Sequence, residues 1–174
     1  MYTKITSQEP LEIVSLAEAK HQLNIIDNDD DDTHIQLLID ACSELAEGYT
    51  KRMLSSGIVD LIISGRQSFF LPYGEATEEE NAIVATADGD PITFEFEPIS
   101  QTLTIDDGQI SPTDKVKITY SAGYKTVPNS VKMGVLMMID TLFNNRGDTV
   151  VGLTVADIPL NSMAILNKVK IENI

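Results

Sequence analysis

The sequence has few of the residues on which chemistry at protein sites most often depends. Its 174 residues include one cysteine, two histidines and no tryptophan. The lone Cys42 cannot form a disulfide within the chain, which indicates a reducing compartment and excludes a disulfide framework. A chain of this length buries roughly 70% of its unfolded surface, so we expect one domain that folds without disulfides or metal.

Basic residues are also scarce. Lysine and arginine total 12 against 27 acidic residues, which gives a formal net charge of -15. Such a surface repels nucleic-acid phosphates and anionic lipid, so we expect neither specific nucleic-acid binding nor membrane binding. No apolar run approaches the ~20 residues that span a bilayer. The first residues lack the apolar region of a secretory signal, and we expect a soluble protein made in the cytoplasm.

The motifs of nucleophilic catalysis and phosphate binding are missing. There is no Gly-x-Ser-x-Gly elbow, and Gly147–Gly152 lacks the lysine and hydroxyl residue of a phosphate loop. His34 and Cys42 lie two helical turns apart, too far to ligate one ion. Cys42 lies on the apolar face of a helix, as inert thiols do. We therefore expect no enzyme, no cofactor and no metal site.

An aspartate-rich run at Asp27–Asp32 invites a calcium hypothesis. An EF-hand loop requires glycine at its sixth position and glutamate at its twelfth. A loop that starts at Asp27 has Asp32 and Leu38 there, and one that starts at Asp29 has His34 and Asp40. Both registers fail, so we interpret the run as a solvated loop before a helix. A small metal-dependent hydrolase that uses this loop remains an alternative.

Three helices are predicted. Ser15 and Glu18 form a capping box at the start of the first. The second is predicted over residues 33–50, and the third extends from Pro128 to Gly147. Helical spacing places these apolar residues on one face of the second helix: Ile35, Leu38, Ile39, Cys42, Leu45, Ala46 and Tyr49.

Between the second and third helices, apolar and polar residues alternate as they do in strands, and glycine and proline residues separate the runs. Asp88-Gly89-Asp90-Pro91 predicts a hairpin turn, and residues 57–122 are predicted as an antiparallel meander. The fold class is therefore α+β, with three main helices as a helical core and the meander inserted between the second and third. We assign residues 1–147 to the main domain and 148–174 to a C-terminal arm; residues 1–14 are predicted as an extended arm.

The third helix is apolar almost all round, so we expect it to be buried on most sides, partly against a neighbouring copy. Arg146 at its end has two interpretations. It pairs with the helix dipole or with Asp148, or it forms a salt bridge to an acidic face of the next copy. The candidate subunit-interface residues are Arg146, Tyr49, Met137, Phe143 and Asp148.

An ordered set of segments resembles a known family. The set consists of Val14-Ser-Leu-Ala-Glu-Ala-Lys20 with Leu23, the aspartate-rich loop, a helix ending Tyr49-Thr-Lys-Arg52, Leu71-Pro72, a strand ending Tyr120-Ser-Ala-Gly-Tyr124, Val127-Pro128, and a helix ending Leu142-Phe-Asn-Asn-Arg146. It is similar to the head–tail connector (adaptor, or head-completion) proteins of tailed phages. Phe143 stands where tyrosine is usual, and Gly147 replaces an acidic residue.

The resemblance implies a structural virion protein without enzymatic activity, located in the neck at the head–tail junction. It would be made in the host bacterial cytoplasm or encoded by a prophage. It would form a ring with copies of itself beneath the portal protein, extend the DNA channel and dock a stopper or tail-completion protein. Packaged DNA would pass through the channel without specific binding. A tail-completion or tail-terminator-like phage protein is the alternative.

Overall fold

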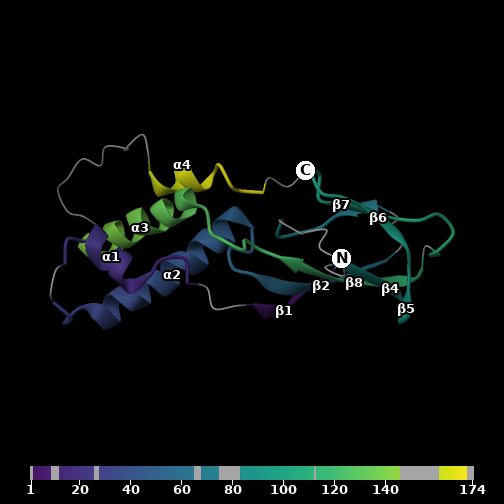
Figure 1. Cartoon of the computed structure of the whole chain (residues 1–174), viewed down its shortest axis with the longest axis horizontal. Helices are drawn as coiled ribbons and strands as arrows, with labels where there is room; N and C mark the ends of the chain where they lie inside the picture. The colour runs from purple at the N-terminus through teal and green to yellow at the C-terminus, as the bar shows by residue number, and fades with distance from the viewer. Residues whose placement is uncertain are drawn as a thin grey trace. The chain divides into compact units, whose positions relative to one another are not determined.

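The computed structural model describes residues 2–8, 12–25, 28–64, 68–74, 83–111, 113–145 and 161–171 (Figure 1). The chain divides into two compact units. One unit, here the sheet unit, consists of Met1–Glu9 and Ser55–Lys125. The other, here the helical unit, consists of Pro10–Leu54 and Thr126–Ile174. Helices and antiparallel strands are both present, which confirms the predicted α+β class.

The sheet unit contains a five-stranded antiparallel sheet of order β1-β2-β8-β4-β5. Its strands are β1 (Tyr2–Gln8), β2 (Gly57–Ser64), β4 (Ile83–Ala87), β5 (Asp90–Pro91) and β8 (Lys115–Ala122). Residues 2–8, predicted as part of an extended arm, therefore form an edge strand that pairs with β2 of the same chain. The central pair β2–β8 is in register over eight residues, from Gly57 opposite Ala122 to Ser64 opposite Lys115.

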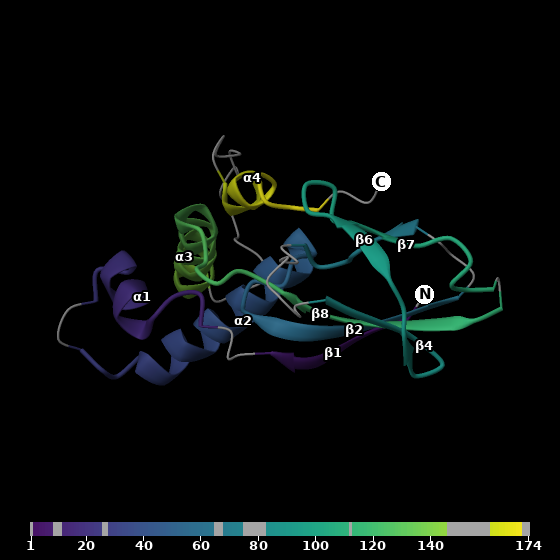
Figure 2. The ribbon, with the colours of Figure 1, turned by 45° about the vertical axis from the view of Figure 1, so that its right-hand side comes forward.

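A second, three-stranded sheet has the order β3-β7-β6. Figure 2 shows β6 and β7 side by side. Its strands are β3 (Ser68–Phe70), β6 (Phe94–Glu97) and β7 (Thr102–Ile105). The turn predicted at Asp88–Pro91 is present, since Ala87 pairs with Asp90. The strand order departs from a simple meander, because β8 lies between β2 and β4, and β3 pairs with β7. Alternation in a sequence specifies the faces of a strand but not its partner.

Alternate residues of the central strands form the core of the sheet unit. The fully buried side chains on β2 and β8 are Val59, Leu61, Val116, Ile118 and Tyr120, with Ile63 nearly so. The Tyr120 hydroxyl donates a 2.6 Å hydrogen bond to the Pro72 carbonyl, which satisfies its polar group in an apolar setting. Burial raises the pKa of Tyr120.

The helical unit contains α1 (Leu16–Gln22), α2 (Asp32–Thr50), α3 (Asn129–Asn144) and α4 (Ser162–Leu166). The capping box of α1 is confirmed: Ser15 Oγ accepts from the Glu18 amide at 3.3 Å, and Glu18 Oε2 accepts from the Ser15 amide at 2.8 Å. The bounds of α2 agree with the predicted 33–50. Figures 1 and 2 both show α4 beside α3.

The helical core is formed by one face of α2 and one face of α3. Its buried residues are Ile35, Ile39, Cys42, Ala46, Val131, Val135, Met138 and Ile139, with Ala19 from α1. The prediction for Leu45 is wrong, because its side chain is 55% exposed. Ser43 and Thr50 are buried on the packed face instead, and the Thr50 hydroxyl donates to the Ala46 carbonyl at 2.8 Å. A hydroxyl that bonds its own helix backbone can be buried at low cost.

The third helix leaves part of its apolar surface uncovered by the described residues of its own chain. Met133 is 47% exposed and Leu142 is 40% exposed, whereas Met137 and Phe143 are half-buried. Gly147, Arg146, Asp148 and the start of the predicted C-terminal arm lie outside the described residues. Within the described part of the chain, none of the helices combines the length and the apolar character needed to span a bilayer.

Candidate subunit interface

The aspartate-rich loop is organised around a lysine. The Lys20 Nζ lies 2.7 Å from Asp29 Oδ1 and 2.8 Å from Asp32 Oδ1. Its hydrogen bond to Asp29 raises the pKa of Lys20 and lowers the pKa of Asp29. Over the ranges that the structure describes, no three acidic, histidine or cysteine side chains are placed to hold a metal ion. The loop is therefore an ion-paired segment that leads into α2.

The five-stranded sheet has one face that the described residues leave open, and we call it the open sheet face. Its large apolar side chains come from three strands and are markedly exposed: Tyr2 (62%), Ile58 (40%), Ile62 (38%) and Val84 (47%). The strand register places Tyr2 opposite Ile62, and Val84 opposite Thr119. Side chains alternate between faces along a strand, so Ile58 and Ile62 share this face.

A polar group lies in the middle of the open sheet face. The Thr119 hydroxyl donates a 2.6 Å hydrogen bond to Asp60 Oδ1, and Lys117 Nζ lies 3.1 Å from Asp60 Oδ2. The Thr119 hydroxyl is the main cause that lowers the pKa of Asp60, with Lys117 in support and partial burial opposing. Each oxygen of the Asp60 carboxylate therefore has a partner on β8.

The side of α2 away from the core carries a second apolar surface, the α2 stripe, formed by Leu37, Ala41 and Leu45. Leu37 is 63% exposed, Leu45 is 55% exposed and Ala41 is half-buried. Residues four apart lie on the same side of a helix, so the three form one line. Leu37 is not among the interface residues predicted from the sequence; the spacing of 37, 41 and 45 is the signal that could have identified it.

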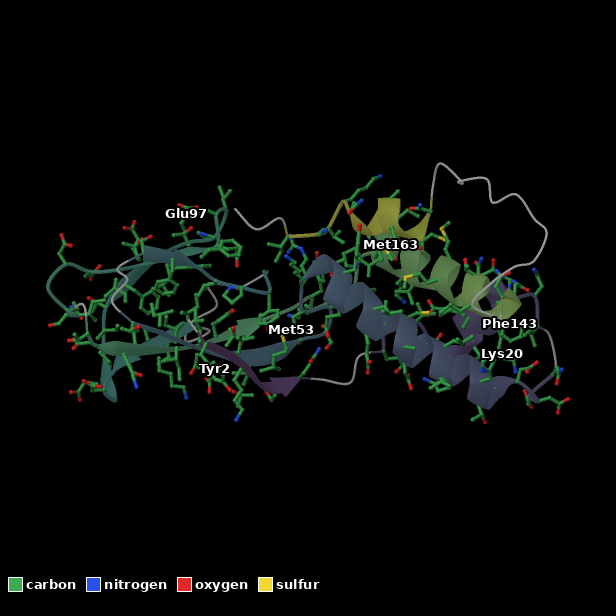
Figure 3. The ribbon with its side chains drawn as sticks, turned by 180° about the vertical axis from the view of Figure 1, so that it is seen from behind. Tyr2, Lys20, Met53, Glu97, Phe143 and Met163 are labelled. Carbon is green, nitrogen blue, oxygen red and sulfur yellow. The ribbon has the colours of Figure 1, made fainter. Side chains whose placement is uncertain are left out.

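The two ends of the helical unit differ in charge. At the acidic end, Asp29–Asp31 precede α2 and Asp32 is its first residue. The Phe143 ring centroid lies 5.9 Å from the His34 ring centroid, at an interplanar angle of 37°. Figure 3 labels Lys20 and Phe143 close together at this end. At the basic end, the C-terminus of α2 meets the segment after α4, which brings together Lys51, Arg52, Lys168 and Lys170.

The predicted interface residues do not form one patch. The Tyr49 hydroxyl donates to Asn167 Oδ1 at 2.6 Å at the basic end, whereas Phe143 lies at the acidic end. His34 and Tyr49 are fifteen residues apart, about 22 Å along α2. Met137 lies half-buried on α3. Arg146 and Asp148 lie outside the described residues.

Solved structures establish the fold independently. The chain is similar to a protein in a structure described as the virion of a native gene transfer agent (GTA) particle, with TM-score 0.72, 18% identity, and coverage of 100% of this chain and 97% of that one. A chain from the neck of an empty GTA particle, computed with C6 symmetry, matches with a TM-score of 0.74 and 17% identity. A chain from the neck of a native GTA particle, computed with C12 symmetry, matches with a TM-score of 0.71 and 16% identity. Coverage is again 100% and 97% in both cases.

The family is identified from the sequence. No curated protein matches the chain. The model of a protein family described as "Head completion protein" matches residues 12–167, which is nearly the whole chain. The match confirms the resemblance inferred from the ordered segments, and the chain belongs to the head completion protein family.

Proposed function

We propose that this protein is a structural head–tail connector that forms a ring in the neck of a virion, beneath the portal. There it extends the DNA channel and provides a docking surface for a stopper or the tail. Membership of the head completion family supports this role. The two neck structures of similar fold were computed with C6 and C12 symmetry, which agrees with a ring.

One structural observation carries the proposal: each unit of the chain leaves large apolar side chains uncovered. The open sheet face contributes Tyr2, Ile58, Ile62 and Val84, and the α2 stripe contributes Leu37 and Leu45. Contiguous apolar surface of this kind marks sites of protein–protein contact. A ring requires two different surfaces on each copy, one for each neighbour, and the chain offers such surfaces on both units.

We also propose that the protein has no enzymatic activity. Burial raises the pKa of the Cys42 thiol to about 11, so this cysteine is a poor nucleophile at neutral pH. The carboxylates of Asp29 and Asp32 are held by Lys20. The net charge of -15 favours passage of DNA without specific binding, because phosphates gain no counterion release from an acidic wall.

The interface residues proposed from the sequence fit this role in different ways. Tyr49 and Phe143 lie at opposite ends of α2, where each is available to a different neighbour in a ring. Met137 lies on the same helix as the exposed Met133. Arg146 and Asp148 remain candidates from the sequence alone.

The first test is the assembly state of the full chain, alone and with the portal protein, measured by size-exclusion chromatography with light scattering and by electron microscopy. We expect a closed ring, formed at least on the portal. A chain that stays monomeric under both conditions contradicts the proposal. A ring that forms only on tail-tube subunits would instead identify a tail-completion or tail-terminator-like protein.

The second test changes the open sheet face. The double variant Ile62→Asn, Val84→Asn keeps the size of these exposed side chains roughly constant and removes apolar surface, so we expect weaker ring formation with an unchanged thermal transition. Ile99→Asn is the matched control, because Ile99 is 95% exposed between β6 and β7, away from the five-stranded sheet. Equal assembly of the double variant and this control would exclude the open sheet face from the interface.

A further inference from the structure

A third of the basic residues of this acidic chain lie at one place. Of the 12 lysines and arginines, four gather at the basic end of the helical unit: Lys51, Arg52, Lys168 and Lys170. Glu47, near the end of α2, contributes a carboxylate to the same segment, and its Oε1 accepts a 2.8 Å hydrogen bond from the Leu54 amide.

The basic end is fixed by several contacts between segments far apart in the chain. The Ile171 amide donates to the Thr50 carbonyl at 2.9 Å, and Arg52 Nε donates to the Val169 carbonyl. Lys170 Nζ lies 4.7 Å above the centroid of the Tyr49 ring, a cation–π contact. Lys51 and Lys168 are exposed beside this framework. The two backbone segments that carry the four basic side chains are therefore held together by these contacts.

The opposite end of the same helix carries the complementary charge. Asp29–Asp32 contribute four carboxylates, with Lys20 as the lysine that pairs with two of them. The Asp29 side chain is 88% exposed even though it is paired with Lys20, and Asp30 is exposed. The two ends are separated by the length of α2, 19 residues or about 28 Å.

We propose that the basic end of one copy binds the acidic end of the next copy, an inference that rests on the proposed ring. A head-to-tail interface requires two different, mutually complementary surfaces on each copy, and the two ends of the helical unit meet that requirement. The contact aligns neighbours and selects their orientation, because like-charged ends repel. It also relieves part of the repulsion expected between copies that each carry a charge of -15.

Duplex DNA is the competing occupant of the basic end, since it also offers closely spaced negative charge. A second copy is the favoured occupant, because every copy carries the carboxylates of Asp29–Asp32 at a fixed position of its own helical unit. DNA phosphates would in addition have to approach a protein with 27 acidic residues against 12 basic ones.

The test uses charge reversal at each end of the full chain. Variant A carries Lys51→Glu and Lys168→Glu, and variant B carries Asp29→Lys and Asp30→Lys. We expect each variant alone to assemble roughly a hundredfold more weakly than the wild type, because like charges then face each other. An equimolar mixture of A and B should assemble again, since alternating copies restore opposite charges at every contact. Sedimentation velocity measures the assembly of variant A, of variant B and of their mixture, with the portal present if the wild type requires it.

The control is Ile99→Glu, Thr113→Glu, Lys125→Glu, which changes the net charge as variant A does but at exposed positions of the sheet unit outside the strands of the open sheet face. It should assemble within about threefold of the wild type. Circular dichroism establishes that every variant is folded. Variant A assembling as well as the control, or folded A and B failing to assemble when mixed, would overturn the inference and leave the ring itself intact.

Two further outcomes are distinct from these. If the wild type forms no ring even on the portal, the proposed function and this inference fail together. If variant A assembles normally but loses binding to a fluorescent 20-base-pair duplex, measured by anisotropy in the same buffer, the basic end is a DNA contact and the inference is wrong.

Discussion

Gly134 of α3 lies directly against Leu166 of α4. A Cβ atom at position 134 would stand 3.1 Å from both Cγ and Cδ2 of Leu166, closer than ordinary van der Waals contact. Leu166 is fully buried. The missing side chain of Gly134 therefore provides the space in which α4 packs on α3, and it explains a glycine in the middle of a helix that would otherwise be more stable with alanine.

This relationship predicts a coupling between the two positions. Gly134→Ala should lower the free energy of unfolding, whereas Gly48→Ala, whose Cβ meets nothing within 4 Å, should raise it by about 0.5–1 kcal/mol through helix propensity. Leu166→Ala alone should cost about 2–4 kcal/mol, because it leaves a cavity. Urea unfolding of each variant supplies these values.

The double variant Gly134→Ala, Leu166→Ala completes the cycle. With the leucine branch removed, Gly134→Ala should become as favourable as Gly48→Ala, so the two substitutions should be strongly non-additive. Additive effects, within about 0.5 kcal/mol, would show that α4 does not rest on Gly134.

The buried thiol gives a second prediction. Cys42 is fully buried on α2, and burial raises its pKa to about 11. At pH 8 we expect the native protein to react with Ellman's reagent at least about a hundredfold more slowly than the urea-unfolded protein, since thiolate is scarce and the sulfur is inaccessible. Cys42→Ala is the blank. Rapid, stoichiometric reaction of the native protein would contradict both this burial and the proposed absence of a nucleophile.

Local features of the fold could be predicted from the sequence because their causes are local. The capping box of Ser15 and Glu18 and the bounds of α2 follow from residues a few positions apart. The pairing of β3 with β7, and of β2 with β8, could not be predicted in this way, because these strands are far apart in the chain. Alternating side chains determine which residues are buried, but many strand orders bury the same residues.

The candidate surfaces show the same limit. Periodicity placed Leu45 on the packed face of α2, but Ser43 and Thr50 are the residues buried there. The Thr50 hydroxyl bonds the helix backbone, whereas the buried Ser43 hydroxyl has no partner among the described residues. The basic end joins two segments more than a hundred positions apart in the sequence, since the Ile171 amide donates to the Thr50 carbonyl. Composition indicated an acidic protein, and only the fold shows that four of its 12 basic residues lie on these two adjoining segments.

The last prediction concerns Asp60 at the centre of the open sheet face. Its pKa in the folded protein is below its ordinary value of 3.8, chiefly because the Thr119 hydroxyl donates to the carboxylate. A lowered folded-state pKa stabilises the native protein above the unfolded pKa, and this contribution is lost as the pH falls through the folded pKa. The gap in unfolding free energy between the wild type and Asp60→Asn should therefore be constant near neutral pH and shrink below about pH 4.

Urea unfolding at several pH values measures that gap, with Glu95→Gln, an exposed carboxylate on β6, as the control for loss of one negative charge. Thr119→Val removes the hydroxyl and keeps Lys117, which lies 3.1 Å from the other carboxylate oxygen. This variant therefore distinguishes the effects of the two groups on the pKa of Asp60. Since the hydroxyl is the larger cause, this variant should raise the pKa of Asp60 more than Lys117→Met does, as followed by NMR of the carboxyl carbon. The reverse order would mean that the lysine, and not the threonine, holds the charge at the centre of this face.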